Sequence, residues 1–526
     1  MRVEPDPWSL ALRLYGSGEE LLPGLHDGEV LKRVEGLIEE AARGLLGEVR
    51  RFHMPTLAWR LREAACEPCG EAVVAPYVEE FDVEGWVEAL PGDPSNPAAW
   101  RGYRGLPIVL AEEPQNPDDL VRAVLLAAEE GAEALLLCPR GAPRVIVTTG
   151  SWGYSFNVGA PTPIAVAYVD PHSCATLKRA GRARLYIDAR TVETVTWGLQ
   201  ARLPGRGRPW LFGAHWDRWP GGFQDDTLGV AQAIAAAVNA ASRGLEAHVL
   251  VFPSEEHGSP GYAGWYWSWG SRFYSIQLKR SGLAGEYAGY INFDVAGSTP
   301  LIVSGSPQLL ASLPPGGWKA RPWECPECDS MQLAVHAGLP TLSIHTLWTP
   351  RAEAIYHTRL DTPERAEPGA ARAAVNLAVR AVLAGPRWEC MEAMVTGLLG
   401  RGPLRARRLA ALILQASKRV GWETLYPVLA REALRPIDYG SRRWSSGPLE
   451  AYWFPEASLL PRLLSDLRGG RDPGEVWVAG WEYPLYTTRP SPGSRPCSVE
   501  CVMAQARSQI EALSERLEDA LRSLLA

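Results

Sequence analysis

The sequence lacks the features that place a protein in a membrane, outside the cell or on nucleic acid. No apolar stretch approaches the ~20 residues of a membrane span. The start, "MRVEPDPWSLALRLYGSG", has no basic segment followed by the apolar core that a secretory signal needs. The formal net charge is -7, and no long basic run is present to follow a phosphate backbone. We therefore expect a cytoplasmic protein that has neither a membrane nor a nucleic-acid partner.

Cysteine is also scarce. The nine cysteines form three close pairs and three single residues: Cys66 with Cys69, Cys325 with Cys328, Cys497 with Cys501, and Cys138, Cys174 and Cys390. The two CxxC pairs would form a structural zinc site if the fold brought them together. No short-range zinc-knuckle pattern accompanies them, so we favour disulfides or free thiols. High arginine and proline content is typical of a GC-rich or thermophilic source, in which intracellular disulfides are less surprising.

The length of 526 residues and the 46% hydrophobic content predict more than one domain. Residues 30–51 have apolar side chains at helical spacing, and residues 86–190 twice repeat a strand, helix, strand pattern that indicates a small α/β insert. Residues 191–385 read as a larger α/β unit preceded by its N-terminal part, 1–85, and residues 386–526 as a mostly helical region. The final helix has one apolar face, which packs on its own core or forms an oligomer interface: Ile510, Leu513, Leu517, Leu521 and Leu524.

Acidic residues and histidine follow three of the four apolar runs in the larger α/β unit. These runs are "WLFGAHWD", "HVLVFPSEE", "AGYINFDV" and "GLPTLSIH". Open α/β sheets place ligand sites just outside the carboxyl ends of their strands. The polar residues that end the first three runs are therefore expected to line one crevice.

The stretch "GAHWDRWPGGFQDDTLG" places a His-x-Asp pair and a double Asp around a glycine turn. A metal-bound histidine commonly gives its second ring N–H to a carboxylate, so Asp217 suits a supporting role to His215 better than a ligand role. Asp225 and Asp226 stand directly before a predicted helix, and a helix cap would explain Asp226 without a metal. This stretch alone leaves a metal site and a capped polar turn open.

Two further stretches concentrate carboxylates near apolar strands. Glu255 and Glu256 in "FPSEEHG" repel each other unless a cation or a proton intervenes. With a divalent ion, one glutamate ligates and the other accepts a proton from water, whereas the alternative is a solvated loop. Asp294 in "INFDVAG" would be nearly buried, and a buried carboxylate is paired or metal-bound. "IYHTRLDT" adds Tyr356 and His357, of which a lone histidine is more often structural.

Taken together, these residues have the ligand inventory of a two-metal hydrolytic centre. The motifs "AHWDRWPGGFQDD", "PSEEHG", "INFD" and "YHTRLDT" resemble those of the co-catalytic di-zinc aminopeptidase and glutamate carboxypeptidase family of exopeptidases, over residues 191–385. "CDSMQLAVHAGLPTLSI" resembles a fifth segment of that family. The ten-residue step from His215 to Asp225 is most similar to the branch that includes glutamate carboxypeptidase II and the transferrin receptor. That branch has a protease-associated insert domain and a helical C-terminal region used for dimerisation.

The resemblance implies a zinc exopeptidase fold, with a mixed central sheet flanked by helices, and two zinc ions, for which cobalt or manganese are possible substitutes. It assigns His215 and Asp294 to one zinc, Glu256 and His357 to the other, and Asp225 to a bridge between them. It further implies a cis peptide bond between Asp225 and Asp226. Its remaining roles are a general base, an oxyanion donor and a brace for the first ligand: Glu255, Tyr356 and Asp217.

One departure from the family favours aminopeptidase activity on peptides. Glutamate-specific members carry arginines shortly before the last ligand, where "GLPTLSIHTLW" has Ser343 and His345. Arg351 and Arg359 lie nearby and could replace those arginines. A carboxypeptidase or dipeptidase is therefore the second hypothesis, and a non-catalytic receptor-like or scaffold homologue is the third. By analogy with the branch we expect a homodimer.

Overall fold

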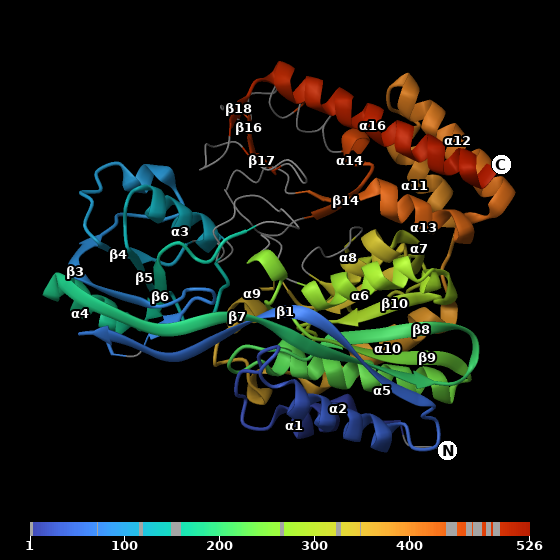
Figure 1. Cartoon of the computed structure of the whole chain (residues 1–526). Helices are drawn as coiled ribbons and strands as arrows, with labels where there is room; N and C mark the ends of the chain where they lie inside the picture. Colours follow the sequence, from blue (N-terminus) through green and yellow to red (C-terminus); the bar gives the residue numbers. More distant parts are fainter. Residues whose placement is uncertain are drawn as a thin grey trace.

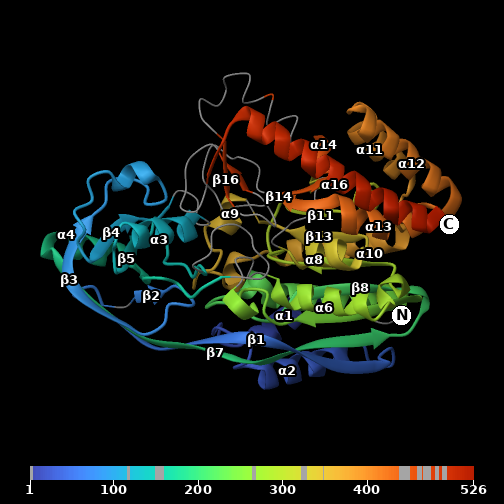
Figure 2. The same cartoon turned by 45° about the horizontal axis from the view of Figure 1, so that its top comes forward.

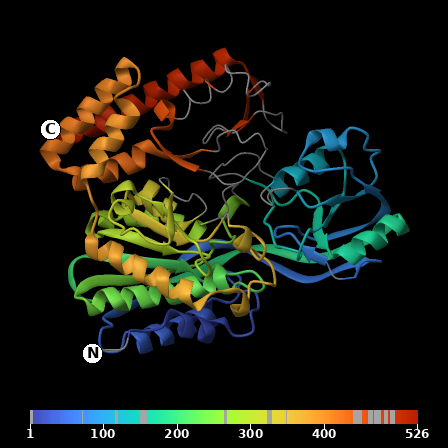
Figure 3. The ribbon, with the colours of Figure 1, turned by 180° about the vertical axis from the view of Figure 1, so that it is seen from behind.

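The computed structural model describes residues 4–70, 72–114, 119–148, 159–262, 268–321, 328–347, 349–437, 450–458, 465, 476–479, 485–487 and 495–525. Three parts are distinguishable in Figure 1: a central α/β core, an insert beside it, and a mostly helical C-terminal part. Figure 3 shows from behind that the insert and the C-terminal part are separate lobes.

A mixed sheet forms the centre of the core, as the family resemblance implied. Its strands in spatial order are β12 (Trp318–Arg321), β11 (Leu301–Gly305), β13 (Thr341–His345), β10 (Gly289–Phe293), β8 (Arg206–His215), β9 (Leu245–Phe252) and β7 (Arg182–Leu203), with β1 (Glu48–Glu67) also paired to β7. Strands β13, β10, β8 and β9 are mutually parallel, while β7 and β11 run antiparallel to their neighbours in this group. The carboxyl ends of the four parallel strands therefore meet at one edge.

Alternate side chains of the parallel strands enter different apolar cores, as the two-residue period of a strand requires. In β8, Phe212 packs in the core that includes α5 (Leu228–Ser242), whereas Leu211 packs in the core that includes α6 (Trp269–Arg280). Helices consequently cover both faces of the sheet (Figure 1). The other helices of this part are α1 (Pro7–Tyr15), α2 (Asp27–Ala41), α7 (Pro307–Leu310), α8 (Asp329–Gln332), α9 (Pro350–Glu353) and α10 (Pro368–Ala384).

The helix predicted over residues 30–51 is shorter than its apolar pattern indicated. It ends at Ala41 as α2, and Glu48 already begins β1. Glu48 pairs with Arg202 of β7, and this antiparallel pairing continues along both strands. Pairing with a distant strand thus overrides the local helical pattern.

The insert is a small α/β unit, carried by the extensions of β1 and β7 out of the core (Figure 2). It contains β2 (Ala72–Val74), β3 (Phe81–Ala89), β4 (Ile108–Glu112), α3 (Leu120–Glu129), β5 (Ala134–Cys138), β6 (Ala165–Val169) and α4 (Pro171–Ala180). Its strand order from β7 outward is β3, β4, β5, β6 and β2. Because β2 pairs with β6, this sheet also uses residues before position 86.

The C-terminal part has its own apolar core, which also takes in Met331 and Ala334 of the α/β core. Its elements are α11 (Glu389–Leu399), α12 (Leu404–Val420), α13 (Trp422–Ala433), β14 (Leu434–Ile437), β15 (Glu450–Trp453), α14 (Pro455–Ser458), β16 (Val476–Ala479), β17 (Leu485–Thr487), β18 (Arg495–Cys497) and α16 (Val499–Leu525). Leu517 and Leu521 of α16 are fully buried in this core, while the side chains of Ile510 and Leu513 lie outside those described. Part of the predicted apolar face thus packs within the chain.

Disulfides account for most of the cysteines. Cys66 bonds to Cys69, Cys138 to Cys174, and Cys497 to Cys501, and Cys328 is also disulfide-bonded. Position 325 lies outside the described residues. Two cysteines taken as single, Cys138 and Cys174, are therefore partners, because β5 and α4 bring their Cα atoms to 5.9 Å. A zinc site that includes Cys66 and Cys69 is excluded in this disulfide state.

None of the helices within the described ranges has both the length and the apolar character needed to cross a membrane.

Candidate metal centre

The polar residues predicted from the strand ends lie together at the carboxyl edge of the parallel strands. His215 is the last residue of β8, and Asp294 directly follows β10. Glu255 and Glu256 follow β9, in a loop that ends at the same edge. The fold therefore gathers residues from three strands into one crevice, for the reason that the sequence indicated.

Asp225 lies between the two predicted histidine ligands. One carboxylate oxygen, Oδ1, is 3.4 Å from Nε2 of His215, and the other, Oδ2, is 3.3 Å from Nε2 of His357. Nε2 of His357 is also 2.9 Å from Oε2 of Glu256. This arrangement matches the role of a bridging carboxylate, with a histidine on each side.

Two overlapping groups of side chains have ligand atoms within 4.8 Å of one another: His215, Asp225 and Glu256, and His215, Asp226 and Asp294. Asp294 is thus beside His215, where the resemblance placed it. Asp226 joins this group as well, and its carboxylate accepts the backbone N–H of His215 at 3.2 Å. The peptide bond between Asp225 and Asp226 is cis. Gly229 leaves room for the Asp226 carboxylate, because a Cβ at position 229 would overlap it.

Asp217 supports the glutamates more directly than it supports His215. Its two carboxylate oxygens accept the backbone N–H groups of Glu255 at 3.1 Å and Glu256 at 3.0 Å. Nδ1 of His215 lies 2.9 Å from the backbone oxygen of Asp217 and 3.8 Å from its carboxylate. Residue 217 therefore orients the imidazole through its carbonyl, and its carboxylate fixes the loop after β9.

The two carboxylate oxygens of Glu255 have different surroundings. The hydroxyl of Ser268 donates to Oε1 at 3.1 Å, while Oε2 lies 3.9 Å from Nε2 of His215. One oxygen of Glu255 is thus anchored and the other faces the centre.

Tyr356 stacks on the imidazole of His357, with ring centroids 3.8 Å apart.

Ser343 and His345, which stand where glutamate-specific exopeptidases carry arginines, are hydrogen-bonded to neighbouring side chains. Oγ of Ser343 accepts from the Asn292 amide at 3.4 Å, and the ring of His345 bonds to Ser304 at 2.9 Å. Arg351 forms an ion pair with Glu367.

Burial and the density of carboxylates shift the proton affinities of the centre. Burial raises the pKa of Asp294 and of Glu255 well above the usual range. Burial also raises the pKa of Asp217 to about 7. For His357 burial acts downward, but the nearby negative charges of Glu256 and Asp225 outweigh it and raise the pKa to about 10. Without a cation, the cluster therefore holds protons that a bound cation would displace.

Several buried ligand atoms have no hydrogen-bond partner among the described residues: Nε2 of His215, Oδ2 of Asp225, both carboxylate oxygens of Glu256, and Nε2 of His357. A buried polar atom without a partner is costly, and such a concentration in one crevice requires an explanation. Imidazole nitrogens and carboxylate oxygens are the donors that Zn²⁺ accepts. The residues present therefore fit a zinc centre.

A cavity of about 910 Å³ opens beside His357. Its walls come from the start of the chain, from β1, from the insert and from the segment after Trp219, and they include Glu20, Trp59, Val145 and Arg359. The cavity is large enough for a short peptide.

Asp361, in the motif "YHTRLDT", is a residue of the centre that the sequence alone did not single out. Asp361 is 2% exposed, and its carboxylate accepts the backbone N–H of Gln224 at 2.9 Å and of Asp225 at 3.1 Å. Its place four residues after His357 was the available signal. The position of Asp225 between the two histidines is thus supported by a second carboxylate.

No protein-family model and no curated protein matches the chain. Solved structures do resemble it: the zinc aminopeptidase BSAP of Bacillus subtilis (17% identity, TM-score 0.57, covering 73% of this chain and 97% of that one) and an aminopeptidase from Aneurinibacillus sp. strain AM-1 (16%, 0.51, 73% and 93%). A third is a peptidase M28 precursor from Shewanella amazonensis SB2B (18%, 0.52, 72% and 92%). The chain therefore has the α/β fold of these peptidases.

Proposed function

We propose that the protein is a zinc exopeptidase, in the first place an aminopeptidase that removes N-terminal residues from peptides. The observation that carries the proposal is the position of Asp225, whose two carboxylate oxygens face the imidazoles of His215 and His357. A carboxylate in this position suits two cations, one beside each histidine. Zinc is the expected metal, and cobalt and manganese are possible substitutes.

When bound, two zinc ions supply Lewis acidity that polarises the peptide carbonyl and acidifies water. Glu255 accepts a proton from the attacking water through Oε2, since Ser268 holds Oε1. The same carboxyl group then delivers the proton to the leaving amine. His215, Asp226 and Asp294 surround one position, and Glu256 and His357 the other. Tyr356, next to the last ligand, is the proposed donor to the developing oxyanion.

Two observations favour an aminopeptidase over a carboxypeptidase. Ser343 and His345 are engaged in hydrogen bonds, and Arg351 is paired with Glu367 and so is not available to a substrate carboxylate. Arg359 lines the cavity, and the carboxypeptidase hypothesis therefore depends on it. The solved structures with this fold include a zinc aminopeptidase and a second aminopeptidase. The insert also supports placement in the branch with a protease-associated domain, and with it a homodimer. We retain the cytoplasm as the expected compartment.

The test compares substrates that differ only at their termini, on protein loaded with zinc. An aminopeptidase hydrolyses leucyl p-nitroanilide and a dipeptide amide but not their N-acetylated forms. A carboxypeptidase cleaves none of these, because all of them lack a free carboxylate, but it hydrolyses an N-acetylated dipeptide whose C-terminal carboxylate is free. Absence of turnover on every substrate, with two ions bound per chain, would favour the receptor-like hypothesis.

A further inference from the structure

The insert contacts His357, the last candidate ligand along the chain, through residues 142–148, which we call the insert strap. The backbone N–H of Val145 donates to the carbonyl of His357 at 2.9 Å. In return, Nδ1 of His357 donates to the carbonyl of Val145 at 2.8 Å. A bridge between Arg144 and Thr358 continues this pairing. One residue of the insert thus holds both the backbone and the side chain of His357.

These two bonds determine which atom of His357 can bind a cation. With Nδ1 donating to Val145, the free nitrogen is Nε2, which faces Glu256 and Asp225. The carbonyl partner fixes the tautomer and the ring plane of a metal-binding histidine. His357 also has a φ of 59°, a left-handed backbone that is costly for a residue with a Cβ and needs support from its surroundings.

The strap is anchored by one buried guanidinium between the insert and the core. Nε of Arg144 is 2.8 Å from Oε1 of Glu113, and the two side chains are 10% and 4% exposed. Glu113 follows β4 of the insert and also accepts from the hydroxyl of Tyr168 at 3.3 Å. Nη1 of Arg144 donates across the interface to the carbonyl of Glu353 in α9, at 3.4 Å. Arg144 therefore ties the insert sheet to the helix that precedes His357.

We propose that the insert is a structural part of the metal centre: the strap positions His357 and thereby sets the affinity of the cation held by His357 and Glu256. The cation that His215 and Asp294 would hold does not depend on the strap directly, because neither residue has a described contact with residues 142–148. Arg144 is a positioning residue that acts through Val145. This inference rests on the proposed two-ion centre.

The test measures zinc binding to the metal-free protein by competition with a chelating dye, which resolves two affinities. The variant combines Arg144→Met with Glu113→Gln, so that no lone charge is left buried. We expect one affinity to fall about 10- to 100-fold, the usual effect of losing support for a metal-binding histidine, and the other to stay unchanged. Wild-type affinities at both sites, or an equal loss at both, would overturn the proposal.

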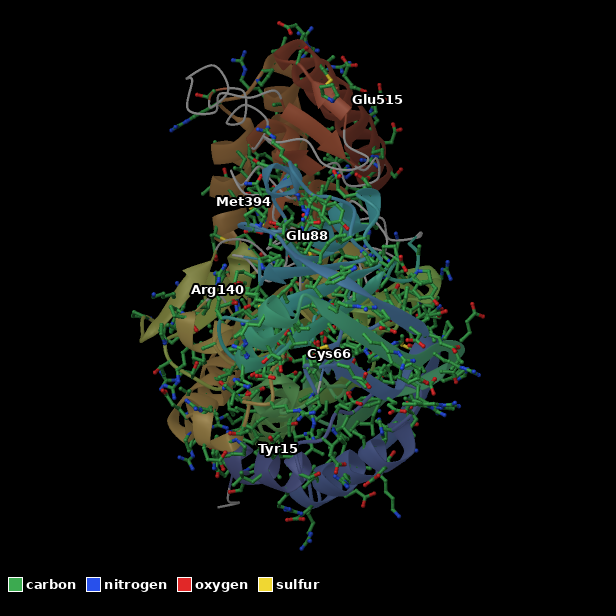
Figure 4. All side chains as sticks on the ribbon, turned by 90° about the vertical axis from the view of Figure 1, so that its left-hand side faces the viewer. Tyr15, Cys66, Glu88, Arg140, Met394 and Glu515 are labelled. Carbon is green, nitrogen blue, oxygen red and sulfur yellow. A yellow bond between two sulfur atoms is a disulfide. The ribbon has the colours of Figure 1, made fainter. Side chains whose placement is uncertain are left out.

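Arg140→Met is the matched control. Arg140 belongs to the same connection after β5 and bonds to Glu113, through its backbone N–H at 3.3 Å and through Nη2 at 3.1 Å. It lies on the exposed face of the insert that Figure 4 presents, and its described bonds stay within the insert. We expect both zinc affinities of this variant to match wild type, and a selective loss of one of them would contradict the role given to Arg144.

A second measurement uses the wild-type protein, so its result does not depend on whether a variant folds. Coupling between two binding events is reciprocal, so if the strap strengthens zinc binding, zinc must stabilise the docked strap by the same factor. Hydrogen exchange of the Val145 amide should slow about 10- to 100-fold when zinc is added. Unchanged exchange, in protein that binds two ions, overturns this inference alone. Wild type that binds fewer than two ions instead overturns the proposed centre, and the inference with it.

Discussion

The carboxylate of Asp361 accepts the backbone N–H of Asp225, 136 residues earlier in the chain, at 3.1 Å. It accepts the neighbouring N–H of Gln224 as well, at 2.9 Å. Asp225 can face two imidazoles only if its backbone keeps this position. The support comes from the segment that also contributes His357, so the two halves of the centre hold each other in place.

Removing this support should weaken the whole centre. Asp361→Ala leaves two buried N–H groups without a partner, at a cost of about 1–3 kcal/mol each. We expect the free energy of unfolding, measured with denaturant, to fall by a few kcal/mol, and zinc affinity to fall with it. Asp361→Asn keeps one oxygen acceptor and should lose less. Equal stability of the alanine variant and wild type would contradict the support role.

The two adjacent glutamates should respond differently to the same change. Glu255→Gln removes the proposed base but no ligand, so zinc content should persist while kcat falls by about 100-fold or more. Glu256→Gln weakens a ligand next to His357, and zinc content itself should fall. Metal analysis of both variants beside their kinetics makes the comparison. Loss of zinc from the Glu255 variant would reverse the assignment.

The metal-free protein should lose stability as pH rises from acid toward neutral. Burial raises the pKa of Asp217 and of Asp361 from 3.8 to about 7. The folded chain therefore binds these protons more tightly than the unfolded chain. The stability this provides is complete below about pH 4 and is lost as pH rises through about 7. The Tm of chelator-treated protein across this range provides the measurement.

Asp361→Asn is the control for that pH dependence, because an amide does not titrate. Its metal-free Tm should change less between about pH 4 and 7 than that of wild type. Added zinc should raise the Tm more at pH 7 than at pH 5, since cation binding must displace protons. Identical pH profiles of the variant and wild type would exclude Asp361 as a source of the effect.

The disulfide between Cys138 and Cys174 should stabilise the insert more than the one between Cys66 and Cys69. The two close loops with sequence separations of 36 and 3. The loop-entropy relation gives about 4 and about 2 kcal/mol for such loops. Paired Cys→Ser variants, unfolded with denaturant under non-reducing conditions, provide the comparison. A larger loss from the Cys66 and Cys69 pair would contradict this order.

Much of the site could be predicted because its residues stand next to short apolar runs that can be recognised in the sequence. His215, Glu255 and Asp294 each follow an apolar run that forms a parallel strand, and parallel strands bring their carboxyl ends together. The α/β character of the insert and of the core likewise follows from alternating strand and helix patterns, whereas the mixed sheet was implied by the family resemblance. The place of Asp226 before α5, in contrast, fits a helix cap as well as a metal-binding group, and its proximity to His215 and Asp294 follows only from the structure.

By itself the sequence determined the α/β fold and the order of the polar residues along the strand ends, since both follow from periodicities of a few residues. Only the tertiary structure decided what holds those residues in place. Val145 meets His357 across 212 residues, Asp361 meets Gln224 across 137, and Cys138 meets Cys174 through the fold of the insert. Such contacts depend on how whole elements pack, and no local pattern in the chain encodes that packing.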